Sequence, residues 1–112
     1  MKLLFICSAN VLRSPTAEAV FSAYPGIEAQ SAGTNHDAET PISGDQIEWA
    51  DLIFVMETIH RKKLQQRFCT LLRRRKVVVL AIPDQFAYMD PQLIKILKKK
   101  VTPYLPGRTN ED

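Results

Sequence analysis

The residue types best suited to chemistry in this sequence are a cysteine and an arginine six positions apart. They enclose a short loop between an apolar run and a helix-like run, with the sequence Cys7-Ser8-Ala9-Asn10-Val11-Leu12-Arg13-Ser14. The N–H groups of such a loop and of a helix start present positive dipole ends to a phosphate-sized anion. The same field favours the thiolate form of Cys7, and the planar Arg13 cation can hold two anion oxygens. The loop therefore predicts an oxyanion site that faces a nucleophilic sulfur.

Cys7 is predicted to attack phosphorus in line and to form a phosphocysteine that water then hydrolyses. Burial for packing alone at the end of a strand is the alternative role, since free cysteine is among the most buried residue types. Arg13 favours the chemical role, because a cation at a helix N-terminus opposes the helix dipole unless an anion binds there. We therefore expect Cys7 and Arg13 to be catalytic.

Every loop residue from Ser8 to Ser14 is a candidate for phosphate binding. Two of them also have predicted local roles. Ser14 is followed by Pro15, which is typical of a helix N-cap followed by proline at the first helical position. Asn10 belongs to the residue types that tolerate a left-handed backbone in a turn. These local roles are compatible with anion binding.

Apolar runs and helical spacing predict alternating strands and helices that position the loop. The predicted strands are residues 2–7, 27–32, 51–56 and 76–82, and the predicted helices are residues 15–24, 43–49, 58–72 and 91–102. This alternation predicts an α/β fold with three layers. We expect a four-stranded parallel sheet of order 2-1-3-4 with helices on both faces. Ligands of such sheets bind beyond the carboxyl ends of the strands, where the loops at Cys7 and Asp84 open.

The loop and its flanks resemble the low-molecular-weight protein tyrosine phosphatase family. The family pattern Cys-x5-Arg-Ser-Pro-x-Ala-Glu-x-x-Phe is matched from Cys7 to Phe21. Residues 31–34 and 50–56 resemble the end of the family's second strand and its third strand, so that the resemblance covers most of residues 2–90. It implies hydrolysis of aryl phosphates such as phosphotyrosine. It also implies that the Ser14 hydroxyl hydrogen-bonds the Cys7 thiolate and that Asn10 braces the loop.

The leaving oxygen needs a proton donor, and in the resembled family an aspartate after the fourth strand supplies it, usually in Asp-Pro. Here Asp84 has the expected place but is followed by Gln85, whereas a literal Asp-Pro occurs at Asp90-Pro91. Asp90 has a structural explanation as a helix N-cap with proline at the first helical position. We therefore favour Asp84 as the general acid and keep Asp90 as the alternative.

Several features of the sequence differ from the resembled family or leave roles open. Phe86 and Tyr88 could form an aromatic wall of the pocket or pack the loop onto the sheet. The connection from Thr34 to Ala50 is seventeen residues long, shorter than in the family. Leu12 stands where many members have a second cysteine, and Cys69 is interpreted as a buried apolar residue. His36 and His60 are isolated in polar surroundings, so neither a metal nor another cofactor is predicted.

Length and composition predict one domain at residues 1–105 and a flexible tail at residues 106–112. The 46% apolar and 24% charged residues are ordinary for a globular protein. The two cysteines suggest a reducing compartment, and the apolar run at residues 3–6 is too short for a signal sequence or a membrane span. We expect a cytoplasmic protein with no membrane partner.

Twelve of the fifteen basic residues fall between Arg61 and Lys100. Solvated helix faces explain this arrangement, and a docking surface for an acidic or phosphorylated partner is the sharper interpretation. Nucleic acid is not an expected partner, because no aromatic residues interleave with the lysines. The expected substrate is a phosphorylated protein or a small aryl phosphate.

Three other functions remain as alternatives to a phosphatase. A thiol-dependent arsenate reductase would need a second thiol, and only Cys69 could supply it. A phosphocarrier similar to the sugar-transport IIB proteins would use Cys7, but Arg13 favours hydrolysis. A protein that binds phosphorylated partners without turnover would fit the short connection and the altered acid segment.

Overall fold

Four parallel strands form one sheet at the centre of the molecule. The structure, a computed structural model, describes residues 1–106. The strands in chain order are β1 (Lys2–Cys7), β2 (Glu28–Gly33), β3 (Leu52–Val55) and β4 (Lys76–Val79). Their order in the sheet is β2-β1-β3-β4, with Cys7 opposite Gly33 and Ile6 opposite Val55. The predicted strand order and parallel sheet are confirmed.

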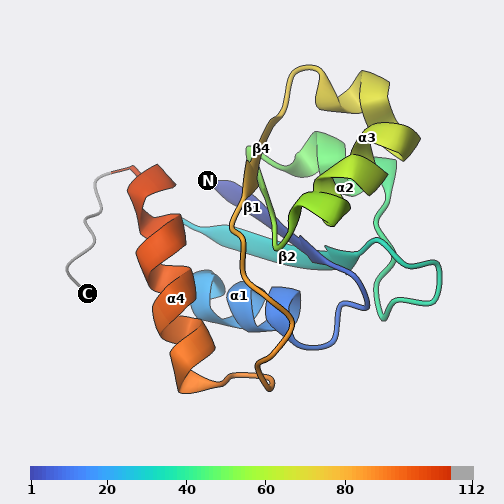
Figure 1. The fold of residues 1–112 in the computed structure, drawn as a ribbon. Coiled ribbons are helices and arrows are strands. Elements are labelled where there is room, and N and C mark those ends of the chain that lie inside the picture. Colours follow the sequence, from blue (N-terminus) through green and yellow to red (C-terminus); the bar gives the residue numbers. More distant parts are fainter. Residues whose placement is uncertain (107–112) are drawn as a thin grey trace.

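Helices cover both faces of the sheet, as predicted. They are α1 (Arg13–Ser22), α2 (Gly44–Trp49), α3 (Thr58–Leu72) and α4 (Pro91–Val101), and a short 3₁₀ turn at Thr102–Tyr104 follows. Figure 1 shows α1 and α4 on one side of the sheet and α2 and α3 on the other. This arrangement leaves the loops at the carboxyl ends of the strands free to meet at one edge.

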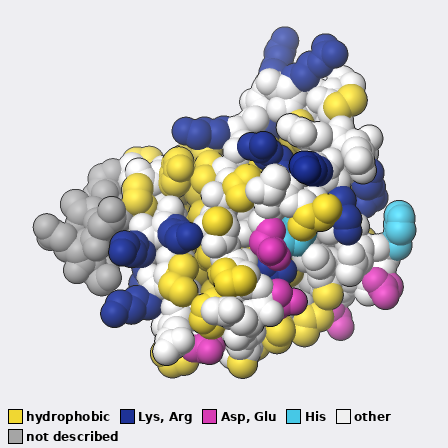
Figure 2. Space-filling model, in the orientation of Figure 1, with side chains coloured by type: hydrophobic (Ala, Val, Ile, Leu, Met, Phe, Trp, Pro, Cys, Tyr) yellow, Lys and Arg dark blue, Asp and Glu magenta, His cyan; other side chains and the backbone are white. Residues whose placement is uncertain are grey.

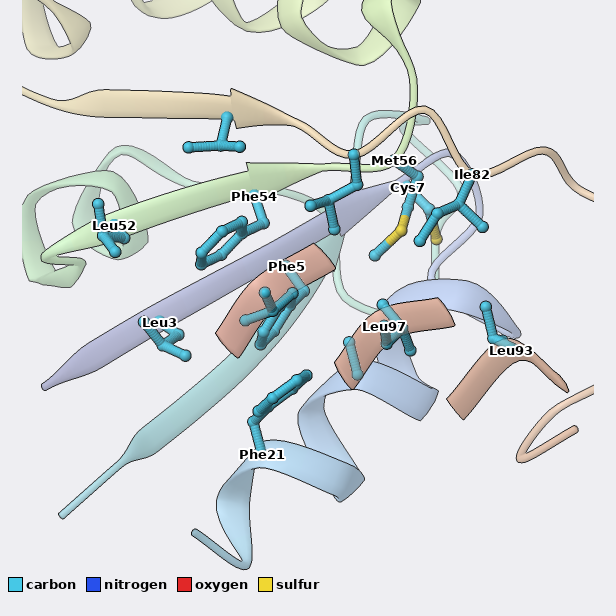
Figure 3. Packing of buried hydrophobic residues seen from close by; sticks show 14 of the residues in the cluster. Leu3, Phe5, Cys7, Phe21, Leu52, Phe54, Met56, Ile82, Leu93 and Leu97 are labelled. Atoms are coloured by element: carbon cyan, nitrogen blue, oxygen red, sulfur yellow. The ribbon is translucent and has the colours of Figure 1, made fainter. Parts of the chain in front are cut away.

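Strand β1 is the centre of the core because both of its faces are covered. On one face, the Phe5 ring stacks with the rings of Phe21 and Phe54, with centroid distances of 5.5 and 5.3 Å. Figure 3 shows this cluster continuing to Cys7 at the carboxyl end of the strand. The Cys7 side chain is therefore held by the same packing that holds the sheet together.

Most predicted element bounds lie within a few residues of the observed ones. Ser43 caps α2 with a capping box, and Asp90 caps α4 by accepting from the Gln92 N–H. The prediction that Ser14 is an N-cap was wrong. Helix α1 begins at Arg13 with Leu12 as its N-cap, and no side chain caps it. Its first N–H groups are therefore left for another acceptor.

Among the described residues, three other than glycine have a left-handed backbone: Asn10 (φ 59°), Ala81 (φ 55°) and Met89 (φ 59°). Asn10 lies in the loop after β1, as expected of a turn residue. Ala81 and Met89 lie in the connection from β4 to α4, residues 80–90, which we call the β4–α4 loop. Left-handed backbone costs about 1–2 kcal/mol in residues with a Cβ. Contacts with neighbouring residues must therefore hold the backbone in this conformation.

Within residues 1–106, no helix has both the length and the apolar character needed to cross a membrane. The predicted tail at residues 106–112 lies outside the described residues except for Pro106.

Candidate active site

A small cavity opens at the carboxyl edge of the sheet, between the loop after β1 and the β4–α4 loop. Its volume is about 110 Å³, and its lining residues are Cys7, Ser8, Ala9, Val11, Leu12, Arg13 and Asp84. The uncapped start of α1 lies in the same loop. A helix N-terminus without a side-chain cap favours a bound anion. The cavity therefore combines a thiol, a guanidinium and a helix start around a space that suits a small oxyanion.

Asn10 and Ser14 do not line the cavity, and their buried side chains support the loop from within. The Cys7 Sγ is 2.9 Å from the Ser14 Oγ, and the Asn10 Nδ2 donates to the same Oγ at 2.9 Å. Asn10 also donates to the Ser31 Oγ, whose hydroxyl donates to Glu18. The Ser14 hydroxyl can donate its hydrogen to the sulfur at 2.9 Å or to the Ala32 carbonyl at 3.5 Å. The chain of bonds ties the loop to α1 and β2.

Arg13 is held from the other side of the loop. Its Nη1 donates to the Glu57 Oε2 at 2.6 Å and to the Ile82 carbonyl at 2.7 Å, and its Nε is 3.8 Å from the Asp84 Oδ1. Only 4% of the Arg13 side chain is exposed. The guanidinium therefore has a fixed position before any anion binds.

Glu57 and His60 form a reciprocal cap at the start of α3, and both reach the loop after β1. The Glu57 N–H donates to the His60 Nδ1 at 3.0 Å, and the His60 Nε2 is 2.9 Å from the Ser8 Oγ. An Nδ1 that accepts requires the hydrogen of the neutral ring on Nε2, which then donates to Ser8. Burial, with the nearby Arg13 charge, lowers the pKa of His60 from 6.5 to about 4. The ring is therefore neutral at pH 7.

Sequence reasoning missed Glu57 and His60. The surroundings of His60 are polar, as expected, since its ring contacts Ser8 and Glu57, but its burial was not predicted. Its side chain is fully buried. The available signal was position: both residues follow directly after β3, so the parallel sheet brings them to the edge where Cys7 lies.

The two candidate acids have different environments. Asp84 lines the cavity, and 63% of its side chain is exposed. Asp90 accepts a hydrogen bond from the Gln92 N–H at 2.8 Å and does not line the cavity. Of the two candidate acids, Asp84 is therefore the one that the structure places at the cavity.

Phe86 and Tyr88 do not line this cavity. Phe86 is buried in the core cluster of β1, whereas Tyr88 is half exposed. Packing of the loop onto the sheet thus accounts for Phe86 and leaves Tyr88 at the surface.

The expectation that Cys69 is buried was wrong: its side chain is exposed. Helix α3 departs from helical geometry at Phe68 (φ −132°, ψ 33°). The apolar face of α3 is nevertheless formed by Leu64, Phe68 and Leu72, and Cys69 lies off this face. Among residues 1–106, no group of three His, Cys, Asp or Glu side chains could hold a metal ion.

Comparison with known proteins agrees with this geometry. Residues 2–48 match the family model described as "Low molecular weight phosphotyrosine protein phosphatase". This segment contains the loop after β1 and the start of α2 but not Asp84. A search of curated protein sequences found no match.

Solved structures of the same fold align with most of the chain. A low molecular weight protein tyrosine phosphatase from T. tengcongensis has a TM-score of 0.75 and 19% identity, with 94% of this chain and 99% of that chain covered. The YwlE arginine phosphatase from Geobacillus stearothermophilus has a TM-score of 0.69 and 21% identity, with coverages of 86% and 87%. The tyrosine phosphatase Wzb from Escherichia coli K30, in complex with phosphate, has a TM-score of 0.65 and 19% identity, with coverages of 86% and 89%.

Proposed function

We propose that this chain is a member of the low molecular weight phosphotyrosine protein phosphatase family, whose model matches residues 2–48, and that it hydrolyses aryl phosphates such as phosphotyrosine. The observation that carries the proposal is the cavity that joins the Cys7 thiol, the Arg13 guanidinium and the Asp84 carboxyl. The substrate would be a phosphorylated protein or a small aryl phosphate. A reducing compartment such as the cytoplasm fits this chemistry, because the thiolate must stay reduced.

In the first step, the Cys7 thiolate attacks phosphorus and the bond to the leaving oxygen breaks, so that the phosphoryl group passes to sulfur. Arg13 and the N–H groups of the loop bind the phosphoryl oxygens as charge develops on them. The Ser14 hydroxyl, 2.9 Å from the Cys7 Sγ, stabilises the thiolate before attack and again when sulfur leaves. Each of these groups acts in both halves of the reaction.

Asp84 donates a proton to the leaving oxygen. In the second step its carboxylate takes a proton from the water that attacks the phosphocysteine. Its exposed position at the rim of the cavity supports this role, because the leaving group departs toward solvent.

An apolar rim around the cavity supports an aryl leaving group. Within residues 1–106, four of the six exposed large hydrophobic residues lie in the loops after β1 and β4 or in the first turn of α3: Val11, Ile59, Tyr88 and Met89. Figure 2 shows hydrophobic side chains beside acidic ones near the middle of one face. Exposed apolar groups gathered at one edge are typical of a binding surface. A phenyl ring attached to the phosphate would contact this rim.

The proposal is tested by phosphate release from p-nitrophenyl phosphate, with reductant and without metal. Wild-type protein should release phosphate, whereas Cys7→Ser should show no turnover above the uncatalysed rate, because the hydroxyl is not ionised and cannot replace the thiolate. Circular dichroism of both proteins controls for folding. Folded wild-type protein that releases no phosphate from this substrate would contradict a phosphatase and favour a module that only binds phosphorylated ligands.

A further inference from the structure

A second cavity lies beside the first and has no role in the proposed mechanism. Its volume is about 420 Å³, and it separates the stretch after β2, from Thr34 to Asp37, from three side chains of α3: Lys63, Gln66 and Arg67. Both walls belong to segments that also contact the loop after β1. The cavity is therefore within reach of a substrate whose phosphate is held at Cys7.

Backbone contacts fix the two cavities next to each other. The Asn35 N–H donates to the Ser8 carbonyl at 3.0 Å, and the Glu39 N–H donates to the Ala9 carbonyl at 3.1 Å. The packing between the two loops is tight, because a Cβ on Gly33 would lie 2.4 Å from the Ser8 carbonyl oxygen. The wall of the second cavity therefore adjoins the loop after β1 directly.

Helix α3 connects the cavities on the other side. His60 hydrogen-bonds Ser8, and Lys63 follows three residues later on the same helix. The Lys63 charge is one of those that lower the pKa of His60, after the larger effects of burial and Arg13. Lys63 therefore lies about one helical turn from the residue that hydrogen-bonds the loop after β1.

The charges of the second cavity favour an anion. Lys63 is half buried, and no ion pair joins it to a carboxylate within residues 1–106. Arg67 is held in place by the Thr34 carbonyl, 3.5 Å from its Nη1, and by the Phe68 ring, 5.1 Å from its guanidinium carbon. Asp37 is the one carboxylate among the lining residues. Two cations therefore face one anion around an open space.

We propose that this second cavity is a substrate subsite for the carboxylate of an acidic side chain close in sequence to the phosphorylated residue. The inference rests on the proposed function and refines its substrate class: a phosphotyrosine with an acidic neighbour. Lys63 supplies the unpaired charge, and Arg67 and Gln66 supply hydrogen-bond donors. A pair of this kind, partly exposed to water, should change kcat/KM by about 2–10-fold.

The test uses phosphotyrosine peptides in which a single glutamate is moved along the positions on either side of the phosphotyrosine, with glutamine at the same position as reference. In wild-type protein, glutamate at one position should raise kcat/KM about 2–10-fold over glutamine, and added salt should reduce this ratio. In Lys63→Gln the ratio should fall toward one. Lys62→Gln is the matched control, because Lys62 is the neighbouring residue on α3 and does not line the cavity; it should keep the ratio.

The ratio of kcat/KM between the glutamate and glutamine peptides tests the subsite separately from the phosphatase chemistry. A ratio near one at every position in wild type, or an equal ratio in wild type and Lys63→Gln, would overturn the subsite while leaving hydrolysis intact. If wild-type protein hydrolyses neither p-nitrophenyl phosphate nor the peptides, the proposed function fails. In that case, the affinity of the Cys7→Ser protein for the same peptide pairs tests the subsite. The subsite predicts tighter binding of the glutamate peptide than of the glutamine peptide.

Discussion

At the scale of single residues, the site depends on groups whose hydrogen bonds are completed before substrate arrives. The Arg13 guanidinium is already oriented by Glu57 and the Ile82 carbonyl, so binding a phosphate does not require ordering a long side chain. The Ser8 hydroxyl is likewise oriented by the neutral His60 ring. Because Ser8 accepts from His60, its own hydrogen remains free to donate toward the cavity. Both arrangements reduce the reorganisation that a transition state requires.

The choice between the two acids leads to a prediction about leaving groups. Asp84→Asn should lower turnover of phenyl phosphate by about 10²–10⁴, and should lower turnover of p-nitrophenyl phosphate less, because that leaving group needs a proton less. Asp90→Asn should leave both rates and the stability near wild type, since asparagine is an equally good N-cap. Steady-state kinetics on the two substrates measures this. Loss of phenyl phosphate turnover in Asp90→Asn alone would reverse the assignment.

The buried His60 predicts a dependence of stability on pH. Its pKa is about 4 in the folded protein and 6.5 as its ordinary value, with Arg13 and Lys63 opposing the charged ring and Glu57 and Asp84 favouring it. Between these pH values the unfolded chain binds more protons, so the stability that His60 contributes is present above pH 6.5 and is lost as the pH falls toward 4. The contribution lost between pH 7.5 and pH 5 is about 2 kcal/mol.

Urea unfolding at pH 7.5 and pH 5, compared between wild type and His60→Gln, measures this effect. The wild-type protein should lose about 2 kcal/mol more than the variant on acidification. The difference between the proteins removes the effect of the carboxylates that both share. Equal losses in the two proteins would mean that the ring is not buried in its neutral form.

At the scale of elements, the catalytic loop is shaped by the end of the neighbouring strand β2. Gly33 is opposite Cys7, and a Cβ there would lie 2.4 Å from the Ser8 carbonyl oxygen and 2.6 Å from the Ala38 Cβ. The absence of a side chain therefore allows the two loops to form their backbone hydrogen bonds. Strand β2 thus sets the position of the phosphate loop from the side.

Gly33→Ala should destabilise the protein by about 1–3 kcal/mol and lower kcat/KM as well, because the backbone of the phosphate loop must move. Gly44→Ala is a suitable control. The nearest atom to its Cβ would be a flexible Leu71 side-chain carbon at 3.1 Å, so that stability changes less and kcat/KM is unaffected. Denaturant titration and kinetics on p-nitrophenyl phosphate test both variants. Full activity in Gly33→Ala would contradict the coupling between β2 and the loop.

At the scale of the whole molecule, the basic residues divide into separate groups with different uses. Figure 2 shows lysine and arginine side chains gathered near α3 and β4 and again beside α4. Some of these side chains already make hydrogen bonds within the protein: Arg75 donates to the Ile47 and Glu48 carbonyls, and Lys100 donates to the Leu80 carbonyl. An acidic partner on the basic helix faces is a proposal that must rely on the remaining charges, of which Lys63 adjoins the active site.

The sequence predicts the sheet and the catalytic loop well because their signals are local. A continuous apolar run ends at Cys7, where β1 ends, and helical spacing predicts the observed bounds of α3. The position of Glu57 and His60 after β3 indicates the correct edge of the sheet, but their contacts could not be predicted, because a single polar residue looks the same in sequence whether it is solvated or buried. The exposure of Cys69 was predictable from the spacing, because Leu64, Phe68 and Leu72 form the apolar face of α3 and Cys69 lies off it.

The three left-handed residues that are not glycine also bear on how the protein could change through evolution. Among residues 1–106, Asn10, Ala81 and Met89 all lie in the two loops that border the active-site cavity. Left-handed residues other than glycine are thus confined, in the described chain, to the edge of the sheet that carries the cavity. Glycine at Ala81 or Met89 would relieve the cost of this backbone conformation. Mutations that stabilise the protein would therefore arise readily at this edge. Selection for turnover would oppose those that alter the cavity.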